Sequence, residues 1–288
     1  MENSEKDCCI CGSTVTLFQV KEKWICEQCL SIGDGNRTSL WAASIENLIK
    51  EYTEACYRCL NSDEPNNINV ARILGRKIQS VLLFLGLPKK HTLLLPIKKV
   101  HFILNTIKET DVLLDEIAEQ NEENKVNAEM VQIFTKKQKN ANELLTKNLP
   151  KLINDSYVTN LKNFVNEKLN SYNLPYIQEK ALRKYEERFN ELINEFNQSV
   201  EIKGKTSQSA VKILYKIRKK AKSLSYIYGF LNDMLGEQYM EKEMYYKDIQ
   251  HQIAKVNDMK DYIDQLKIYE KKIHAPKKEK TAIKNKLK

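Results

Sequence analysis

Glycine and proline are scarce in this chain, with eight and six residues in a total of 288. A β-sandwich or barrel of this length needs more turn residues than that, whereas long helices need few. So few glycines also argue against a glycine-rich loop that cradles phosphates. With 42% hydrophobic and 30% charged residues, the composition predicts an α-rich, soluble protein with long helices.

Long apolar runs are missing as well. The longest patches are Val81–Leu85 and Leu93–Leu95, far short of the roughly 20 residues that span a bilayer. The N-terminal residues MENSEKDCC contain no apolar core, so they do not form a signal peptide. Five of the seven cysteines fall within the first 29 residues, which is not the pattern of a secreted disulfide protein. We expect a cytoplasmic protein with reduced thiols and no membrane association.

Motifs of known catalytic sites are absent from the sequence. It contains no HExxH, no Gly-x-Ser-x-Gly, no P-loop and no GxGxxG, and its four histidines are scattered at 91, 101, 251 and 274. We therefore predict that the protein is not an enzyme and takes no small-molecule substrate. The remaining alternative is an enzyme whose residues the fold gathers from distant positions.

The most specific feature present is a pair of CxxC motifs. Fourteen residues separate Cys8-x2-Cys11 from Cys26-x2-Cys29. Two such pairs supply four thiolates, the usual tetrahedral ligand set of structural zinc, with no position left for a catalytic water. We predict one structural Zn²⁺ held by Cys8, Cys11, Cys26 and Cys29. Cys9 leaves the register open, although the two-residue spacing to Cys11 favours Cys8.

Residues 8–29 resemble the zinc-ribbon group. The resemblance rests on the second CxxC motif and on the Cys-x-x-Cys-Gly form of Cys8 to Gly12. It implies a β-hairpin stabilised by the metal, in which 14–20 pairs with 23–25. Zinc ribbons in general bind nucleic acid or protein, and many are purely structural. We recognise no family for the remaining chain.

Beyond residue 37, apolar residues recur every three or four positions, which is typical of amphipathic helices. We expect helices near 38–61, 67–86, from Pro96 through Ile117, and near 128–148, 151–171 and 176–202, with Pro150 and Pro175 at breaks. The first helix should bury Trp41, Ile45, Leu48, Ile49, Tyr52 and Cys56. The second should bury Ile68, Ala71, Ile73, Leu74, Ile78, Val81, Leu82 and Leu85.

The predicted fold is mainly α, with a division into four parts. A four-cysteine zinc ribbon occupies 1–34, and an all-α multi-helix domain follows over 38–203. Residues 206–274 carry near-heptad apolar stripes and predict a long helical hairpin or coiled-coil-like arm. The Lys-rich tail, 275–288, is predicted to be disordered.

Basic residues gather near the start of that arm. Residues 204–236 contain seven basic residues and one acid, Asp233, in a chain of net charge +9. Lys212, Lys216, Lys219 and Lys220 follow helical spacing along one face. We predict a nucleic-acid-binding surface in which Tyr215, Tyr226 and Tyr228 stack on bases. Its cations are Lys212, Lys216, Arg218, Lys219, Lys220 and Lys222. The alternative is a solvated helix face whose tyrosines fill the core.

A third CxxC motif, Cys56 to Cys59, lies within the first predicted helix. It is either half of a second metal site or redox pair, or two thiols on a buried helix face; we favour buried thiols, because no further CxxC motif remains to partner it.

Two functions follow. The first is a non-enzymatic, zinc-containing protein that binds DNA or RNA through the basic helical face, with the ribbon as a docking or recognition knob. The alternative is an interaction adaptor or assembly factor that uses the ribbon and the long helices to hold a protein partner or a second copy.

Overall fold

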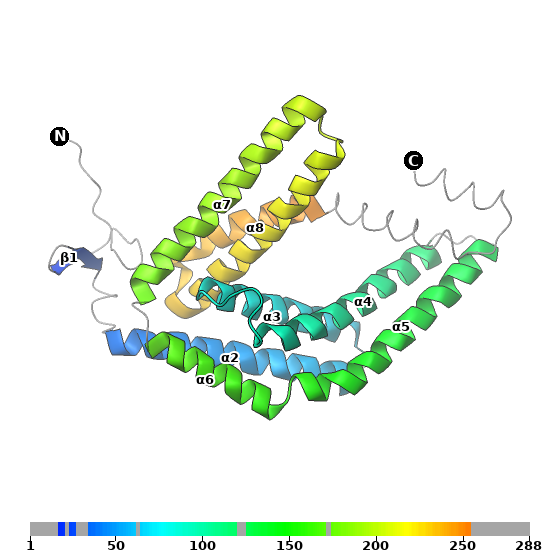
Figure 1. Cartoon of the computed structure of the whole chain (residues 1–288), viewed down its shortest axis with the longest axis horizontal. Coiled ribbons are helices and arrows are strands. Elements are labelled where there is room, and N and C mark those ends of the chain that lie inside the picture. Colours follow the sequence, from blue (N-terminus) through cyan, green and yellow to red (C-terminus); the bar gives the residue numbers. More distant parts are fainter. Residues whose placement is uncertain are drawn as a thin grey trace. The chain divides into compact units, whose positions relative to one another are not determined.

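The computed structural model describes residues 17–20, 23–26, 34–61, 64–119, 125–170 and 174–254. Strand β1 (Leu17–Val20) pairs antiparallel with β2 (Lys23–Cys26), so that Leu17 lies opposite Cys26. The other described elements are helical (Figure 1), which confirms the mainly α prediction. They are α2 (Asp34–Asn61), α3 (Pro65–Phe84), α4 (Leu94–Glu119), α5 (Lys125–Leu152), α6 (Asp155–Asn170), α7 (Leu174–Lys203), α8 (Gln208–Leu235), the 3₁₀ turn η1 (Glu237–Tyr239) and helical residues 240–254.

The two prolines behave differently from each other. Pro175 lies in the first turn of α7, where its missing N–H leaves no intrahelical hydrogen bond unmade. Pro150 was predicted to separate two helices, yet α5 continues through it to Leu152. A proline this close to a helix end removes only one bond of the ladder, so the helix ends two residues later rather than before the proline.

The described residues divide into two compact units. The first unit takes its residues from 1–51, 76–94 and 155–250, and the second from 52–75, 95–154 and 251–288. Helices α2 and α3 each contribute one end to each unit. None of the helices in the described ranges is both long and apolar enough to cross a membrane.

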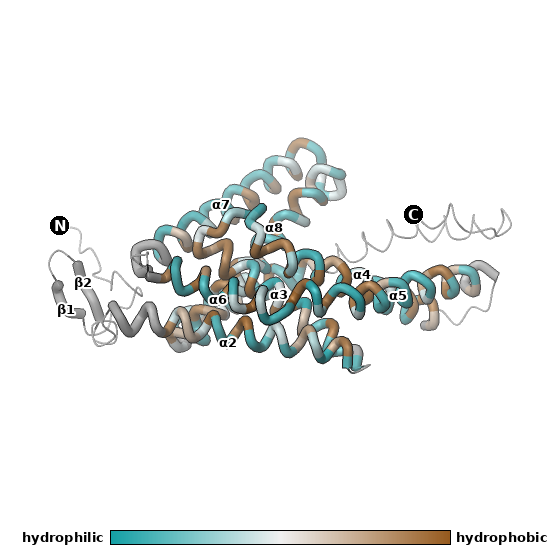
Figure 2. The backbone as a smooth tube through the Cα atoms, turned by 60° about the horizontal axis from the view of Figure 1, so that its bottom comes forward, coloured by the Kyte–Doolittle hydropathy of each residue, from teal (hydrophilic) through white to brown (hydrophobic). Residues whose placement is uncertain are grey.

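In the second unit, α3, α4 and α5 present apolar faces to a common core. Figure 2 shows hydrophobic and hydrophilic residues alternating along α5, and Phe134 and Leu145 of this helix are buried. Two cross-helix hydrogen bonds join the elements, from Arg72 Nε to Asn105 Oδ1 (2.7 Å) and from Gln138 Nε2 to Asp111 Oδ1 (2.5 Å). The predicted core position Ile73 was wrong, because its side chain is 40% exposed.

In the first unit, four aromatic rings from four helices form the centre of the core. Trp41 of α2 stacks on Phe84 of α3 with centroids 6.2 Å apart, and it contacts Phe230 of α8 at 5.4 Å. Phe84 in turn meets Tyr185 of α7 edge-on at 6.1 Å. Such aromatic contacts add to the free energy gained by burying the rings and fix their relative positions.

Helices α7 and α8 form a hairpin in this unit, and their turn follows from two residues. Gly204 ends α7 with φ of +82°, a left-handed conformation that glycine adopts without strain. Ser207 caps α8, since its hydroxyl accepts a hydrogen bond from the Ala210 amide at 3.3 Å. The hairpin places the middle of α7 beside the middle of α8 (Figure 1).

Candidate anion-binding cluster around Lys220

Lys220 of α8 lies over an aromatic ring of α7. Its Nζ atom is 3.5 Å from the centroid of the Tyr185 ring, a close cation–π contact. Because Tyr185 also packs against Phe84, the aromatic core of the first unit positions the ring beneath the ammonium group. Lys220 is half-buried, whereas its neighbour Lys219 is exposed.

The turn between α3 and α4 brings a second lysine to this place. Gly86 has φ of +88°, its amide donates to Leu83 O (3.1 Å), and the Leu87 amide donates to Leu82 O (3.0 Å). This is the Schellman arrangement that ends many helices, here fixed further by burial of Leu87. The turn therefore has a defined path, and it carries exposed Lys89.

Three cations lie near enough to Lys220 for their charge to act on it: Lys89 from this turn, and Lys184 and Arg188 from α7. Burial lowers the pKa of Lys220 most, and the positive charges of Lys89, Arg188 and Lys184 add to this effect, so that the pKa falls to about 8. Lys89, Lys184 and Arg188 are exposed. Four cations from three segments thus form an electropositive cluster open to solvent, which we call the Lys220 cluster.

Arg188 of the Lys220 cluster forms ion pairs with two carboxylates of its own helix. Its Nη1 atom lies 2.6 Å from Glu191 Oε2 and 3.4 Å from Glu195 Oε1. Both acids are on the same helix and all three side chains are about half exposed. Exposed pairs of this kind contribute little free energy, so an incoming anion can compete with the glutamates for the guanidinium.

The structure separates the six predicted nucleic-acid contacts. Lys212, Lys216 and Lys219 are exposed, while Arg218, Lys220 and Lys222 are half-buried. The tyrosines that were expected to stack on bases have other neighbours. Tyr215 lies beneath Lys219 (5.4 Å), Tyr226 lies beneath Lys222 (5.7 Å), and Tyr228 is buried.

Tyr228 belongs to a polar network on the C-terminal side of the hairpin. Glu186 Oε1 accepts hydrogen bonds from Tyr228 Oη (2.8 Å), Lys242 Nζ (2.9 Å) and Tyr246 Oη (3.2 Å). Burial tends to raise the pKa of Glu186, but the bonds from Lys242 and the two tyrosines outweigh it and hold the pKa below its usual value. Burial and the charge of Glu186 raise the pKa of both tyrosines. The network joins helical residues 240–250 to α7 and α8.

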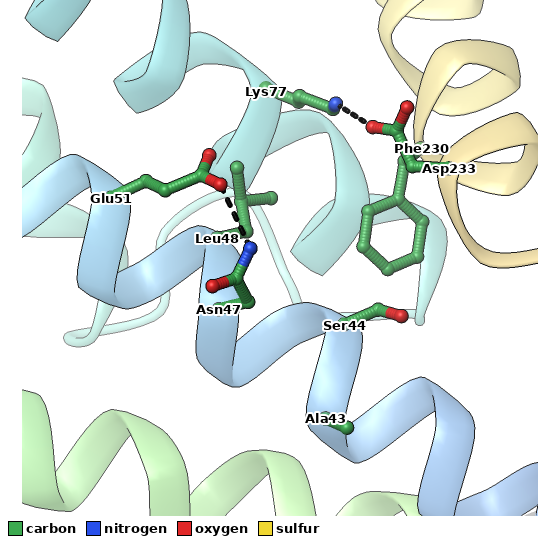
Figure 3. A pocket seen from close by; sticks show the side chains of 8 residues that line it. All are labelled: Ala43, Ser44, Asn47, Leu48, Glu51, Lys77, Phe230 and Asp233. Carbon is green, nitrogen blue, oxygen red and sulfur yellow. Dashed lines mark hydrogen bonds and ion pairs between the residues drawn. The ribbon is translucent and has the colours of Figure 1, made fainter.

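A cavity of about 280 Å³ lies elsewhere in the first unit, between α2, α3 and α8. Figure 3 shows Lys77 and Asp233 pointing toward each other beside Phe230, and their ion pair measures 2.5 Å. Glu51 accepts a hydrogen bond from Asn47 at 2.8 Å. Since these charged groups already have partners inside the cavity, its lining offers a ligand less than the Lys220 cluster does.

The predicted zinc ligands cannot be compared with the structure. Cys8, Cys11 and Cys29, with Cys9, lie outside the described residues, and the side chain of Cys26 is not described either. The zinc ion and its four ligands stay a prediction. Within the described ranges, no three His, Cys, Asp or Glu side chains gather in a way that could hold a metal.

The third CxxC motif is described. Cys56 is buried, and Cys59 Sγ donates to Ala55 O at 3.2 Å. Burial raises the pKa of Cys56 to about 12 and that of Cys59 to about 11, so neither thiol ionises near neutral pH. This agrees with the interpretation of two thiols on a helix face.

Sequence reasoning predicted Lys220 as an anion contact from its spacing on α8, but it did not single out Lys184 or Arg188. Lys184 and Arg188 stand four residues apart on one helix, a signal visible in the sequence. Their meeting with Lys89 and Lys220 depends on which helices pair, and no local spacing reports that.

Comparison with known proteins gives one structural likeness. No family model matches the chain, and no curated protein matches it in sequence. Among solved structures, the chain is similar to the CHAD domain from the plant Ricinus communis, with a TM-score of 0.62 and 14% sequence identity. The match covers 87% of this chain and 85% of that one. At this identity the likeness concerns the fold alone.

This comparison corrects two predictions. The sequence resemblance to the zinc-ribbon group over residues 8–29 is not supported by any family model. The helical part of the chain, for which no family was recognised, resembles a solved structure in its fold. The sequence did not reveal this likeness, since two helical proteins can share a fold at 14% identity. Helix packing requires apolar residues at the right spacing rather than particular residues. The predicted function as a zinc-containing nucleic-acid-binding protein, with its adaptor alternative, is corrected too, because the fold resembles a CHAD domain and no comparison supports zinc or nucleic-acid binding.

Proposed function

We propose that the Lys220 cluster binds a phosphate-rich polyanion that carries no bases, such as a short linear polyphosphate. The observation that carries the proposal is that Lys89, Lys184 and Arg188, from two other segments of the first unit, lie near enough to half-buried Lys220 for their positive charge to act on it. Lysine and arginine are the side chains that proteins use most for phosphate recognition.

The number of cations favours an anion with several charges. Burial is the main cause of the lowered pKa of Lys220, and repulsion from its positive neighbours adds to it. That repulsion is relieved most by a ligand whose charges neutralise several members of the cluster together. A chain of phosphoryl groups carries several negative charges in a row, whereas a monoanion neutralises only one member of the cluster.

The tyrosines argue against recognition of bases. A base stacks on an exposed aromatic face, but Lys220 covers Tyr185 and Tyr228 is buried. Tyr215 is exposed, with Lys219 Nζ 5.4 Å from the centre of its ring. What the cluster offers a ligand is charge and N–H donors. The ligand class is therefore defined by its phosphates.

Isothermal titration of the full chain with sodium tripolyphosphate tests the proposal. Lys184→Gln is expected to weaken binding about tenfold, the loss that follows from removing one charge-assisted hydrogen bond. Lys147→Gln, which removes the same charge from an exposed position on α5 in the second unit, should leave the affinity unchanged. Binding should also weaken as salt rises, because added ions screen exposed charges.

Two results would contradict this function. One is the absence of tripolyphosphate binding at low salt. The other is tighter binding of single-stranded RNA than of polyphosphate matched in number of phosphates, which would mean that bases contribute after all.

A further inference from the structure

The turn that joins α7 to α8 exposes an apolar side chain between charged groups. Ile202 is 78% exposed, a larger fraction than any other bulky hydrophobic side chain has in the described part of the chain. Lys203 and Lys205 flank Gly204, and both are exposed. Residues 201–206, all exposed, form what we call the hairpin tip. The tip therefore presents one bulky apolar group and two ammonium groups at the end of the hairpin (Figure 1).

Hydrogen bonds on both sides fix the conformation of the hairpin tip. The Gly204 amide donates to Val200 O at 2.9 Å, and the Ser207 amide donates to Gly204 O at 3.2 Å. Next to the tip, the hydroxyls of Ser199 and Ser209 are 3.0 Å apart and join the two helices. The exposure of the apolar side chain is therefore a property of the folded hairpin.

Positive charge dominates the chain around the hairpin tip. Residues 196–220 contain seven basic residues and one acid, Glu201, which is exposed. Lys212, also exposed, lies in the second turn of α8, about 6 Å along the helix axis from the first residue of the helix. This surplus of cations favours an anionic partner.

We propose that the hairpin tip docks on the surface of a lipid bilayer that contains anionic headgroups. Such a surface offers both kinds of contact that the tip can make. Its negative headgroups suit Lys203, Lys205 and Lys212, and the apolar boundary of its acyl chains suits Ile202. A nucleic-acid backbone or a free polyphosphate offers charge without an apolar layer, so it leaves the isoleucine in water. The exposed isoleucine is therefore the feature that favours the bilayer.

Docking of this kind differs from membrane spanning. The expectation of no membrane association rested on the lack of long apolar runs, which argues only against spanning. Each lysine near an anionic bilayer strengthens binding about fivefold, and burial of an isoleucine side chain adds to this. The expected binding is reversible and sensitive to salt. It does not depend on the Lys220 cluster, so this inference and the proposed function can fail separately.

Cosedimentation of the full chain with lipid vesicles tests the inference. Vesicles of phosphatidylcholine with about 30% phosphatidylserine are expected to bind the protein at low salt, and vesicles of pure phosphatidylcholine about a hundredfold more weakly. Added salt should release the protein from the anionic vesicles, because ions screen the charge of the headgroups.

The contribution of charge is tested with a double variant. Lys203→Gln/Lys205→Gln should weaken binding to the anionic vesicles about 25-fold, since two cations are lost. Lys136→Gln/Lys147→Gln removes the same charge from exposed positions of α5 in the second unit, and it should bind as the parent does. Lys219→Gln should matter less than Lys205→Gln, because Lys219 lies about 16 Å along α8 from its first residue, beyond the screening length of about 10 Å.

The apolar contribution is tested at Ile202. Ile202→Ser should weaken binding about tenfold, because less apolar surface leaves water. Leu144→Ser, at a 51% exposed position on α5, is the matched control and should not weaken it. Insertion has a direct readout in Ile202→Trp, whose added fluorescence should be quenched by lipids with brominated acyl chains. Leu144→Trp should show no more quenching than the parent.

Three results would overturn the inference. The first is the absence of binding to the anionic vesicles at low salt. The second is binding without quenching of Ile202→Trp, since charge alone would then hold the protein at the bilayer. The third is binding of single-stranded RNA as tight as that of vesicles at equal phosphate concentration, and weakened as much by Ile202→Ser. Titration of Ile202→Ser with tripolyphosphate should give the affinity of the parent, which separates this inference from the proposed function.

Discussion

Lys220 Nζ lies 3.5 Å from the centroid of the Tyr185 ring, so a charged group of α8 rests on an aromatic group of α7. The ring stabilises the cation, while burial and three neighbouring positive charges destabilise it. Burial, the largest effect, and these charges lower the pKa of Lys220 to about 8. The hairpin therefore holds a lysine whose charged form is disfavoured by burial and by its charged neighbours.

The lowered pKa of Lys220 predicts that the stability of the fold depends on pH. Between pH 8 and about 10.4 the unfolded chain holds a proton on residue 220 that the folded chain has lost, so the contribution of Lys220 to the free energy of unfolding rises with pH. Lys220→Gln should accordingly be more stable than the parent at pH 7, and the difference should shrink by pH 10. Urea unfolding at both pH values measures it, with Lys147→Gln as the control. A difference that does not change with pH would contradict the assigned cause.

The Glu186 network predicts a second effect of mutation. Glu186→Ala leaves buried Tyr228 without its acceptor and removes the partner of Lys242 and Tyr246. Loss of hydrogen bonds to a charged group should cost about 2 kcal/mol of the free energy of unfolding. Glu187→Ala, at the exposed neighbouring position, should change it little. Equal effects of the two variants in urea unfolding would show that the network does not stabilise the fold.

Acid should weaken the same network. The pKa of Glu186 is lower in the folded chain than in the unfolded one, so its stabilising contribution is complete above the unfolded value of about 4.3 and is lost as pH falls through the folded value. The destabilisation caused by Glu186→Ala should therefore diminish in unfolding experiments at progressively lower pH. A constant penalty down to pH 2 would be the opposite result.

Gly75 is predicted to resist replacement by alanine. A Cβ at this position of α3 would lie 3.0 Å from Cε2 of Tyr52, whose ring is buried and 1% exposed, and 3.6 Å from Ile97 Cγ2. Alanine gains about 1 kcal/mol of helix propensity, but overpacking costs about 1–3 kcal/mol, so Gly75→Ala should be destabilising overall. Gly229→Ala is the comparison, since the three atoms nearest its Cβ belong to the carboxylate end of the Glu243 side chain rather than to a buried ring. Thermal unfolding that ranks Gly229→Ala as the more harmful change would refute this account.

Cys56 and Cys59 should react slowly with thiol reagents. Their raised pKa values, about 12 and about 11, leave almost no thiolate at pH 8. Iodoacetamide labelling of the folded chain, mapped by mass spectrometry, should leave both thiols unmodified, and labelling in denaturant should modify both. Rapid labelling of Cys56 in the folded chain would show that it is not buried as described.

Part of the fold was predictable because amphipathic spacing is a local property. The buried positions Trp41, Ile45 and Tyr52 followed from it, and all three are at most 3% exposed. Pro150 was wrongly expected to separate two helices, because a helix can continue through a proline close to its end. Ile73 was wrongly expected to be buried, because the width of a buried helix face depends on the elements that pack against it. The tyrosines of α8 show the same limit, since only tertiary packing placed lysines over Tyr215 and Tyr226.

The sequence by itself determined that the chain is helical, where most helices begin and end, and that α8 is rich in lysine. Tertiary structure alone decided that Lys89, Lys184 and Arg188 meet around Lys220, and that Tyr185 supports it. The physical reason is the difference in distance along the chain over which these interactions act. Helix propensity, capping and apolar spacing act within a few residues, whereas the charge felt by Lys220 depends on groups more than thirty residues away along the chain.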